Sequence, residues 1–252
     1  MRRSSTISCG TWRQPIKWNA KHDRFYEENA RRQRVFCASL ADVFDNQVPD
    51  KWRHDLFGLI ASTPNLDWLL LTKRPQNISR MTSPLWSGWK NVWIGTTVEN
   101  QQEADRRIPL LLQTPAAVRF LSCEPLLGPV NLGEWLLTPG WSPSYYDPDN
   151  IHGYPNAEPT NEHIQWCVVG GESGSGARPM HPDWARSLRD QCQAAGVPFL
   201  FKQWGEFVSV SEVEGDGPHH QFADGATVRR IGKKAAGRLL DGRIWDEFPG
   251  VK

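Results

Sequence analysis

The chain has few cysteines and no long apolar run. Its 252 residues include 5 cysteines, an odd number at wide spacings with no CxxC pair. A disulfide framework or a zinc site of closely spaced thiols is therefore not predicted. No segment approaches the roughly 18 apolar residues that span a bilayer, and the start, MRRSSTISCGTW, has no apolar run behind its two arginines. We therefore expect a cytoplasmic protein with no membrane partner.

The chain also lacks an excess of charge of either sign. The chain has 29 basic and 28 acidic residues, for a net charge of +1. This balance does not indicate non-specific binding to nucleic acid or to a membrane surface. The sequence has no HExxH, no P-loop, no zinc spacing and no Ser–His–Asp order, so it predicts no metal site and identifies no catalytic residue.

The sequence does contain short apolar runs, and these alternate with helical or loop segments. Strand–crossover–strand alternation indicates parallel pairing with right-handed crossovers. We predict an α/β fold, a partial TIM-like (β/α)6 barrel of parallel strands whose first strand is missing, with an open doubly wound sheet as the alternative. The predicted strands are 34–39, 66–72, 91–97, 118–123, 164–171 and 197–204.

The segments between the strands complete the prediction. Helical patterns cover 49–63, 100–114 and 181–196; in these, Asn100 caps a start, Pro109 kinks or breaks the helix, His181 opens a helix and Gly196 ends it. Residues 76–81 form a short helix, and 126–136 a short loop and helix. We expect 1–33 to be irregular, 138–163 to be a long loop, and 205–252 to be a peripheral extension of one domain, 1–252.

A charged residue follows every predicted strand. In parallel α/β folds, binding and catalytic groups gather at the carboxyl ends of the strands, where side chains from several strands meet. We therefore predict one ligand-binding mouth at these ends, with a purely structural ring of ion pairs as the alternative. The candidate residues are Asp42, Lys73, Arg74, Glu99, Glu124, Glu172 and Lys202.

Two further residues join this predicted mouth. Arg178 lies with Glu172 in the glycine-rich segment GGESGSGARPMHP, which is typical of a turn that approaches a ligand closely. Trp204 follows Lys202 and either stacks on a base or covers the barrel rim. Mixed carboxylates and cations suit a small zwitterionic or nucleotide-like ligand, and nucleic acid is a second candidate partner.

Six segments together resemble the phage-associated proteins of a domain-of-unknown-function family, numbered fifty-one thirty-one. These segments are FCASLADVFDNQVP, DWLLLTKRPQNI, NVWIGTTVENQ, FLSCEPLLGPV, VVGGESGSGARPMHPDW and FLFKQWGEF. The resemblance runs from about Trp12 to the C-terminus. It implies a partial (β/α)6 barrel similar to radical S-adenosylmethionine enzymes, with the strand ends lining the pocket for cofactor and substrate.

The resemblance also implies a cofactor set for full-length relatives. Those relatives carry three cysteines near the N-terminus that hold a [4Fe–4S] cluster, which binds S-adenosylmethionine. This chain has only Cys9 in that region. We therefore expect an N-terminally shortened chain that binds no cofactor cluster of its own. Three functions stay open: a radical enzyme if full length, a non-catalytic nucleotide or nucleic-acid binding protein, and a decayed prophage remnant.

Overall fold

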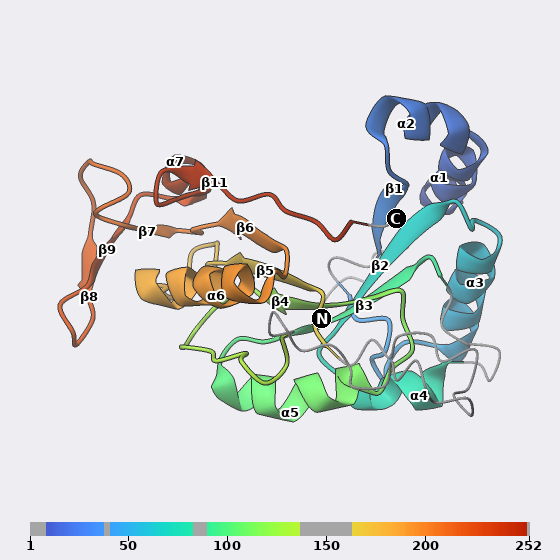
Figure 1. Cartoon of the computed structure of the whole chain (residues 1–252), viewed down its shortest axis with the longest axis horizontal. Helices are drawn as coiled ribbons and strands as arrows, with labels where there is room; N and C mark the ends of the chain where they lie inside the picture. Colours follow the sequence, from blue (N-terminus) through green and yellow to red (C-terminus); the bar gives the residue numbers. More distant parts are fainter. Residues whose placement is uncertain (1–8, 38–40, 83–89, 137–162, 251–252) are drawn as a thin grey trace, which may run out of the picture. The chain divides into compact units, whose positions relative to one another are not determined.

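A single sheet of six strands in chain order organises the structure (Figure 1). The computed structural model describes residues 9–37, 41–82, 90–136 and 163–250, with side chains from Trp12 onward. The sheet order β1-β2-β3-β4-β5-β6 has no reversal, which a doubly wound sheet requires. The strands are β1 (Gln33–Cys37), β2 (Leu66–Thr72), β3 (Val92–Thr97), β4 (Val118–Cys123), β5 (Trp166–Gly170) and β6 (Phe199–Gln203).

This topology confirms the predicted fold class, a partial TIM-like barrel of parallel strands. The pairs β1–β2, β4–β5 and β5–β6 are parallel, and every predicted apolar run overlaps its strand. The runs of β3 and β4 were readable because these two strands are covered on both faces: all six residues of each are buried. No residue of β1 is buried, so the prediction of a buried strand there is wrong.

The chain divides into two compact units. One comprises Met1–Gly95 with Thr114–Ala117 and Val251–Lys252, and the other comprises Thr96–Gln113 with Val118–Gly250. The assignment of 1–252 to one domain therefore stays a prediction. The extension after residue 204 belongs to the second unit.

The first unit contains two helices, α1 (Cys9–Ala20) and α2 (His22–Asn29), that the sequence pattern did not indicate. Its other described helices, α3 (Asp50–Ala61), η1 (Pro75–Asn77) and α4 (Ile78–Met81), confirm the helices predicted at 49–63 and 76–81. The prediction that residues 1–33 are irregular is wrong, because α1 and α2 lie there. No residue of α2 is buried, so the helix has no apolar stripe to give a periodic signal.

The second unit contains two longer helices and several short elements. They are α5 (Gln101–Leu112), α6 (Pro182–Ala195), β7 (Phe207–Ser209), β8 (His219–Gln221), β9 (Thr227–Arg230), α7 (Lys233–Ala236), β10 (Leu239–Leu240) and β11 (Arg243–Ile244). These short elements confirm that residues beyond 204 form turns and short strands. Figure 1 shows α6 beside β5 and β6, which it contacts.

The predicted caps of the second unit are confirmed. Asn100 Oδ1 accepts from the backbone N–H of Glu103 at 3.1 Å, and His181 Nδ1 accepts from the N–H of Asp183 at 3.1 Å. Gly196 ends α6 with a φ of 66°, a left-handed conformation that favours glycine. Pro109 lies inside α5 and does not end it.

The segments that follow β4 differ in part from the prediction. The helix expected within 126–136 is absent, because Leu126–Leu136 form only bends and turns. The long loop expected at 138–163 lies almost wholly outside the described residues. Within the described part of the chain, no helix has the length and apolar character needed to cross a bilayer.

Candidate ligand site at the strand ends

The carboxyl ends of β3 to β6 in the second unit form what we call the strand-end rim. Backbone hydrogen bonds tie neighbouring strand ends together: Leu127 N donates to Glu99 O at 2.7 Å, and Leu126 N donates to Gly170 O at 3.0 Å. Side chains on this rim therefore start from fixed backbone positions. The rim comprises Glu99, Glu124, Glu172, Arg178, Lys202 and Gln203.

The ends of β5 and β6 lie in direct backbone contact. A Cβ atom on Gly171 would lie 1.8 Å from the carbonyl oxygen of Trp204, and a Cβ on Gly205 would lie 2.1 Å from the carbonyl oxygen of Glu172. Gly205 also has a φ of +84°, which side-chain-bearing residues rarely adopt. Glycine is therefore required at both positions by packing, and the two strand ends support each other.

Glu124 occupies the centre of the rim. Its Oε2 accepts from Lys202 Nζ at 2.7 Å, and its Oε1 accepts from Gln203 Nε2 at 2.7 Å. A Cβ atom on Gly170 would lie 3.2 Å from Oε1, so the glycine leaves the space that this carboxylate uses. The Lys202 side chain is 54% exposed and that of Glu124 is 18% exposed. Solvent thus reaches the lysine side of this ion pair.

Glu172 and Arg178 form a second, bidentate ion pair. Arg178 Nε donates to Glu172 Oε2 at 2.8 Å, and Nη2 donates to Oε1 at 2.9 Å. The hydrogen bond from Arg178 lowers the pKa of Glu172, so this carboxylate stays ionised in weak acid. The Arg178 pKa is raised, chiefly by Glu172 and to a smaller extent by Glu99, which places Glu99 within electrostatic range.

Glu99 forms the most buried pair of the rim. Its Oε2 accepts from Arg107 Nη1 at 2.7 Å, with the two side chains 14% and 8% exposed. Arg107 also donates to the carbonyl oxygen of Thr97 at 2.8 Å. This pair secures α5 to the end of β3. No sequence pattern indicated Arg107, which lies in the middle of a helix.

Asp42, Lys73 and Arg74 lie in the first unit. Asp42 Oδ2 accepts from Thr72 Oγ1 at 3.0 Å, from Lys73 N at 2.9 Å and from Arg74 Nη1 at 3.3 Å. Arg74 Nη2 also lies 3.1 Å from an oxygen of Asp45. With so many donors, Asp42 acts as a clamp that ties the loop after β1 to the end of β2.

Trp204 does not present a face to a ligand. The residue is 1% exposed, and its indole N–H donates to the carbonyl oxygen of Leu239 at 2.6 Å. Of the two roles considered for this residue, the geometry supports packing under the rim. Gln203 is the neighbouring polar side chain that reaches the site. Regular alternation along β6 would place it on the face opposite Lys202, so the sequence did not indicate it; the pairing of β5 with β6 shifts register at this point.

The four cysteines whose side chains are described do not suit a [4Fe–4S] cluster. Cys123, Cys167 and Cys192 are fully buried, and Cys123 Sγ lies 4.0 Å from Cys167 Sγ. Contact with a neighbouring thiol, followed by burial, raises the pKa of Cys167 and of Cys192. Burial raises the pKa of half-buried Cys37 to about 11. Cluster ligands are thiolates, so these thiols act instead as small apolar groups.

A family model describing a protein of unknown function, DUF5131, matches residues 2–249. The chain belongs to the DUF5131 family. This confirms the domain-of-unknown-function family that the six segments indicated. No curated protein and no solved structure matches the chain. The family description states no activity, and the chemistry of the strand-end rim follows from its own residues.

Proposed function

We propose that this protein binds an amino-acid zwitterion of the S-adenosylmethionine type at the strand-end rim, as a relative of radical S-adenosylmethionine enzymes. The observation that carries the proposal is the pair formed by Glu124 and Lys202, whose charged atoms lie 2.7 Å apart. A ligand with both an ammonium and a carboxylate group can pair its ammonium with Glu124 and its carboxylate with Lys202. Such an exchange leaves no charge unpaired.

The surroundings of the pair support a ligand-binding role. Gln203 holds the second oxygen of Glu124, so the carboxylate keeps its orientation when Lys202 moves away. Lys202 is exposed, and an exposed ion pair contributes only about 0.2–1 kcal/mol. Opening this pair therefore costs little. The buried pair of Glu99 and Arg107 is far harder to break and serves as structure.

We assign ligand binding to this chain and no redox step. A [4Fe–4S] cluster would supply the electron that starts radical chemistry on S-adenosylmethionine. The four cysteines with described side chains do not suit that cluster, so we assign no reaction to them. The phage association implied by the resemblance stays a prediction, which the genes beside this one would test.

Calorimetric titration with S-adenosylmethionine tests the proposal. We expect saturable binding, and we expect Glu124→Gln and Lys202→Met each to weaken it at least about tenfold, because each removes a charged hydrogen-bond partner. Glu28→Gln is the matched control, since Glu28 is an exposed carboxylate in an ion pair with Arg24. Absence of binding by the wild type, or equal binding by all variants, would contradict the proposal.

Nucleic-acid binding is the second candidate function. The segment 229–238 carries five basic residues and no acidic one. The backbone N–H groups of Ile231 and Gly232 donate to Glu206 O at 3.1 Å, and Glu206 N donates to Glu172 O at 2.9 Å. The basic segment therefore lies beside the rim. Lys233 and Lys234 within it are exposed.

Binding of a fluorescent single-stranded oligonucleotide across a salt series tests this second function. If it holds, affinity falls steeply with salt. Replacing both lysines, by Lys233→Glu with Lys234→Glu, then weakens binding and lowers the salt slope by about one for each phosphate that is no longer neutralised. Lys51→Glu is the control, because Lys51 is an exposed lysine in the first unit, on α3. A salt slope unchanged by the double substitution would argue against this function.

A further inference from the structure

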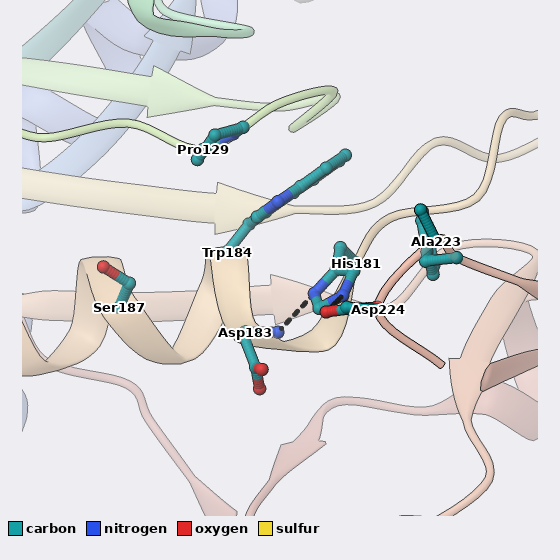
Figure 2. A pocket seen from close by; sticks show the side chains of 8 residues that line it. Pro129, His181, Asp183, Trp184, Ser187, Ala223 and Asp224 are labelled. Carbon is teal, nitrogen blue, oxygen red and sulfur yellow. Dashed lines mark hydrogen bonds and ion pairs between the residues drawn. The ribbon is translucent and has the colours of Figure 1, made fainter. Parts of the chain in front are cut away.

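A second candidate site lies at the N-terminal end of α6, formed by the second unit alone. It is an open cavity of about 480 Å³. Figure 2 shows Trp184, His181 and Asp224 gathered on one side of it, with Pro129 across from the indole. The lining residues are Pro129, His181, Asp183, Trp184, Ser187, Phe222, Ala223 and Asp224.

Aromatic rings form one wall of this cavity. The ring centroids of His181 and Phe222 are 4.5 Å apart, those of His181 and Trp184 are 5.5 Å apart, and those of Trp184 and Phe222 are 5.8 Å apart. Trp184 and Phe222 come from α6 and from the loop after β8. The face of an aromatic ring is electron-rich and its edge is electron-poor, so a tryptophan or phenylalanine face that borders the cavity suits an organic cation.

His181 fixes a negative charge beside these rings. Its Nδ1 accepts from the backbone N–H of Asp183, so that nitrogen carries no proton. The proton of the neutral ring is therefore on Nε2, which lies 2.9 Å from Asp224 Oδ2 and donates to it. Asp224 thus receives a hydrogen bond from the His181 ring. Its pKa is lowered, chiefly by the N–H of Ala226 and then by His181, and it stays ionised.

The charges around α6 strengthen this negative potential. Arg186 contacts Asp183, Glu212 and Asp241, and Arg189 contacts Asp190 and Asp241. These contacts join two guanidinium groups to four carboxylates, and Asp224 adds a fifth. Asp183 also lines the cavity, but its Oδ1 lies 3.1 Å from Arg186 Nη1, so that guanidinium group already balances its charge. Asp224 is therefore the carboxylate that is left to attract a cation in the cavity.

A metal ion suits these residues less well. His181, Asp183 and Asp224 offer three ligand atoms within 4.8 Å of one another. A neutral histidine that binds a metal through Nε2 must carry its proton on Nδ1. Here Nδ1 faces the N–H of Asp183 at 3.1 Å, so a proton there would oppose another donor. The helix cap thus disfavours metal binding at this histidine.

We infer that this cavity binds an organic cation, an alkylammonium group held between Trp184, Phe222 and the carboxylate of Asp224. The site is separate from the strand-end rim and depends on different residues. It recognises positive charge on an apolar, methylated or alkyl-substituted head group. Such a ligand matches both the aromatic wall and the excess of carboxylates around α6.

Titration with choline and with its uncharged isostere 3,3-dimethylbutan-1-ol tests the inference, with ligand-observed NMR on the full chain as the readout. We expect choline to bind and the alcohol to bind at least about threefold more weakly, because it lacks the charge that Asp224 attracts. Asp224→Asn should remove this preference. The asparagine oxygen can still accept from Ala226 N–H, so the turn should persist, while the hydrogen bond from His181 Nε2 to the second carboxylate oxygen is lost.

The control is Asp55→Asn, an exposed carboxylate on α3 of the first unit that pairs with Lys51. It should leave the preference for choline unchanged. Equal binding of choline and the alcohol, no binding of either, or loss of the preference in Asp55→Asn would each overturn the inference. Trp184→Phe keeps a ring but weakens the attraction to a cation, so it should lower choline affinity more than alcohol affinity.

Discussion

Replacement of Gly171 by alanine tests the backbone contact on which the strand-end rim depends. The new Cβ would lie 1.8 Å from the carbonyl oxygen of Trp204 and 2.7 Å from its carbonyl carbon. Both atoms belong to the backbone, so no flexible side chain can give way. Ordinary contact requires about 3.5 Å between such atoms, and the end of β5 or of β6 must therefore move by roughly 1.5 Å.

Such a movement has two energetic consequences. Overpacking of this kind costs about 1–3 kcal/mol. The shift also breaks the bond from Gly171 N to Gln203 O, which is 2.9 Å long, and an unsatisfied buried donor costs about 1–3 kcal/mol more. We therefore expect Gly171→Ala to lower the free energy of unfolding by about 3 kcal/mol or more, and to weaken ligand binding at Glu124, which Gln203 orients.

Urea unfolding followed by circular dichroism measures this effect, and Gly176→Ala provides the matched control. Gly176 lies in the same glycine-rich loop, and no atom lies within 4 Å of the place that its Cβ would take. Its substitution should be neutral or should stabilise by up to about 0.4–1 kcal/mol. Equal midpoints for Gly171→Ala and Gly176→Ala would refute the close crossing of β5 and β6.

Two further predictions concern buried groups. Burial raises the pKa of Asp67 above 3.8, and its Oδ1 has no hydrogen-bond partner in the described part of the chain. The folded protein therefore holds a proton that the unfolded chain has released, so stability falls as pH rises through the raised pKa. Asp67→Asn should remove this fall in the free energy of unfolding with pH, as measured by urea unfolding across a pH series; an unchanged pH profile would contradict it. The second prediction concerns three buried cysteines, Cys123, Cys167 and Cys192. The pKa values of Cys167 and Cys192 are also raised. Iodoacetamide should therefore alkylate all three only in urea, as measured by peptide mass spectrometry. Fast labelling of the folded protein would show that the thiols are accessible.

The strands could be predicted from the sequence because burial on both faces leaves a continuous apolar run. β2 shows this most clearly: six of its seven residues, Leu66–Thr72, are buried. The helix α2 could not be predicted in the same way, since none of its residues is buried. Sequence periodicity reports the face that an element buries, and an element without such a face leaves no pattern.

The positions of Glu99 and Glu124 at strand ends were also predictable, but the residues they pair with were not. Strand ends indicate where Glu99 and Glu124 emerge from the core. They do not indicate that Glu99 pairs with Arg107 on α5 and Glu124 with Lys202 on β6, because those contacts depend on how elements pack. The cavity beside α6 was missed for the same reason. Its local signal, Asp224 followed by Gly225, is typical of a hairpin turn and does not reveal His181 as a partner.

Two of the three ion pairs described at the rim have different roles, one in structure and one in ligand binding. Glu99 and Arg107 are 14% and 8% exposed, and removal of one partner from a buried pair costs about 3–5 kcal/mol. Few ligands could recover such a loss, so this pair supports the purely structural interpretation. Lys202 is 54% exposed, and its pair with Glu124 contributes at most about 1 kcal/mol, or about a fivefold change in affinity. A zwitterion that meets both charges recovers this energy on binding. Glu124 and Lys202 are thus the rim positions at which charge can be exchanged with a ligand while the fold is kept.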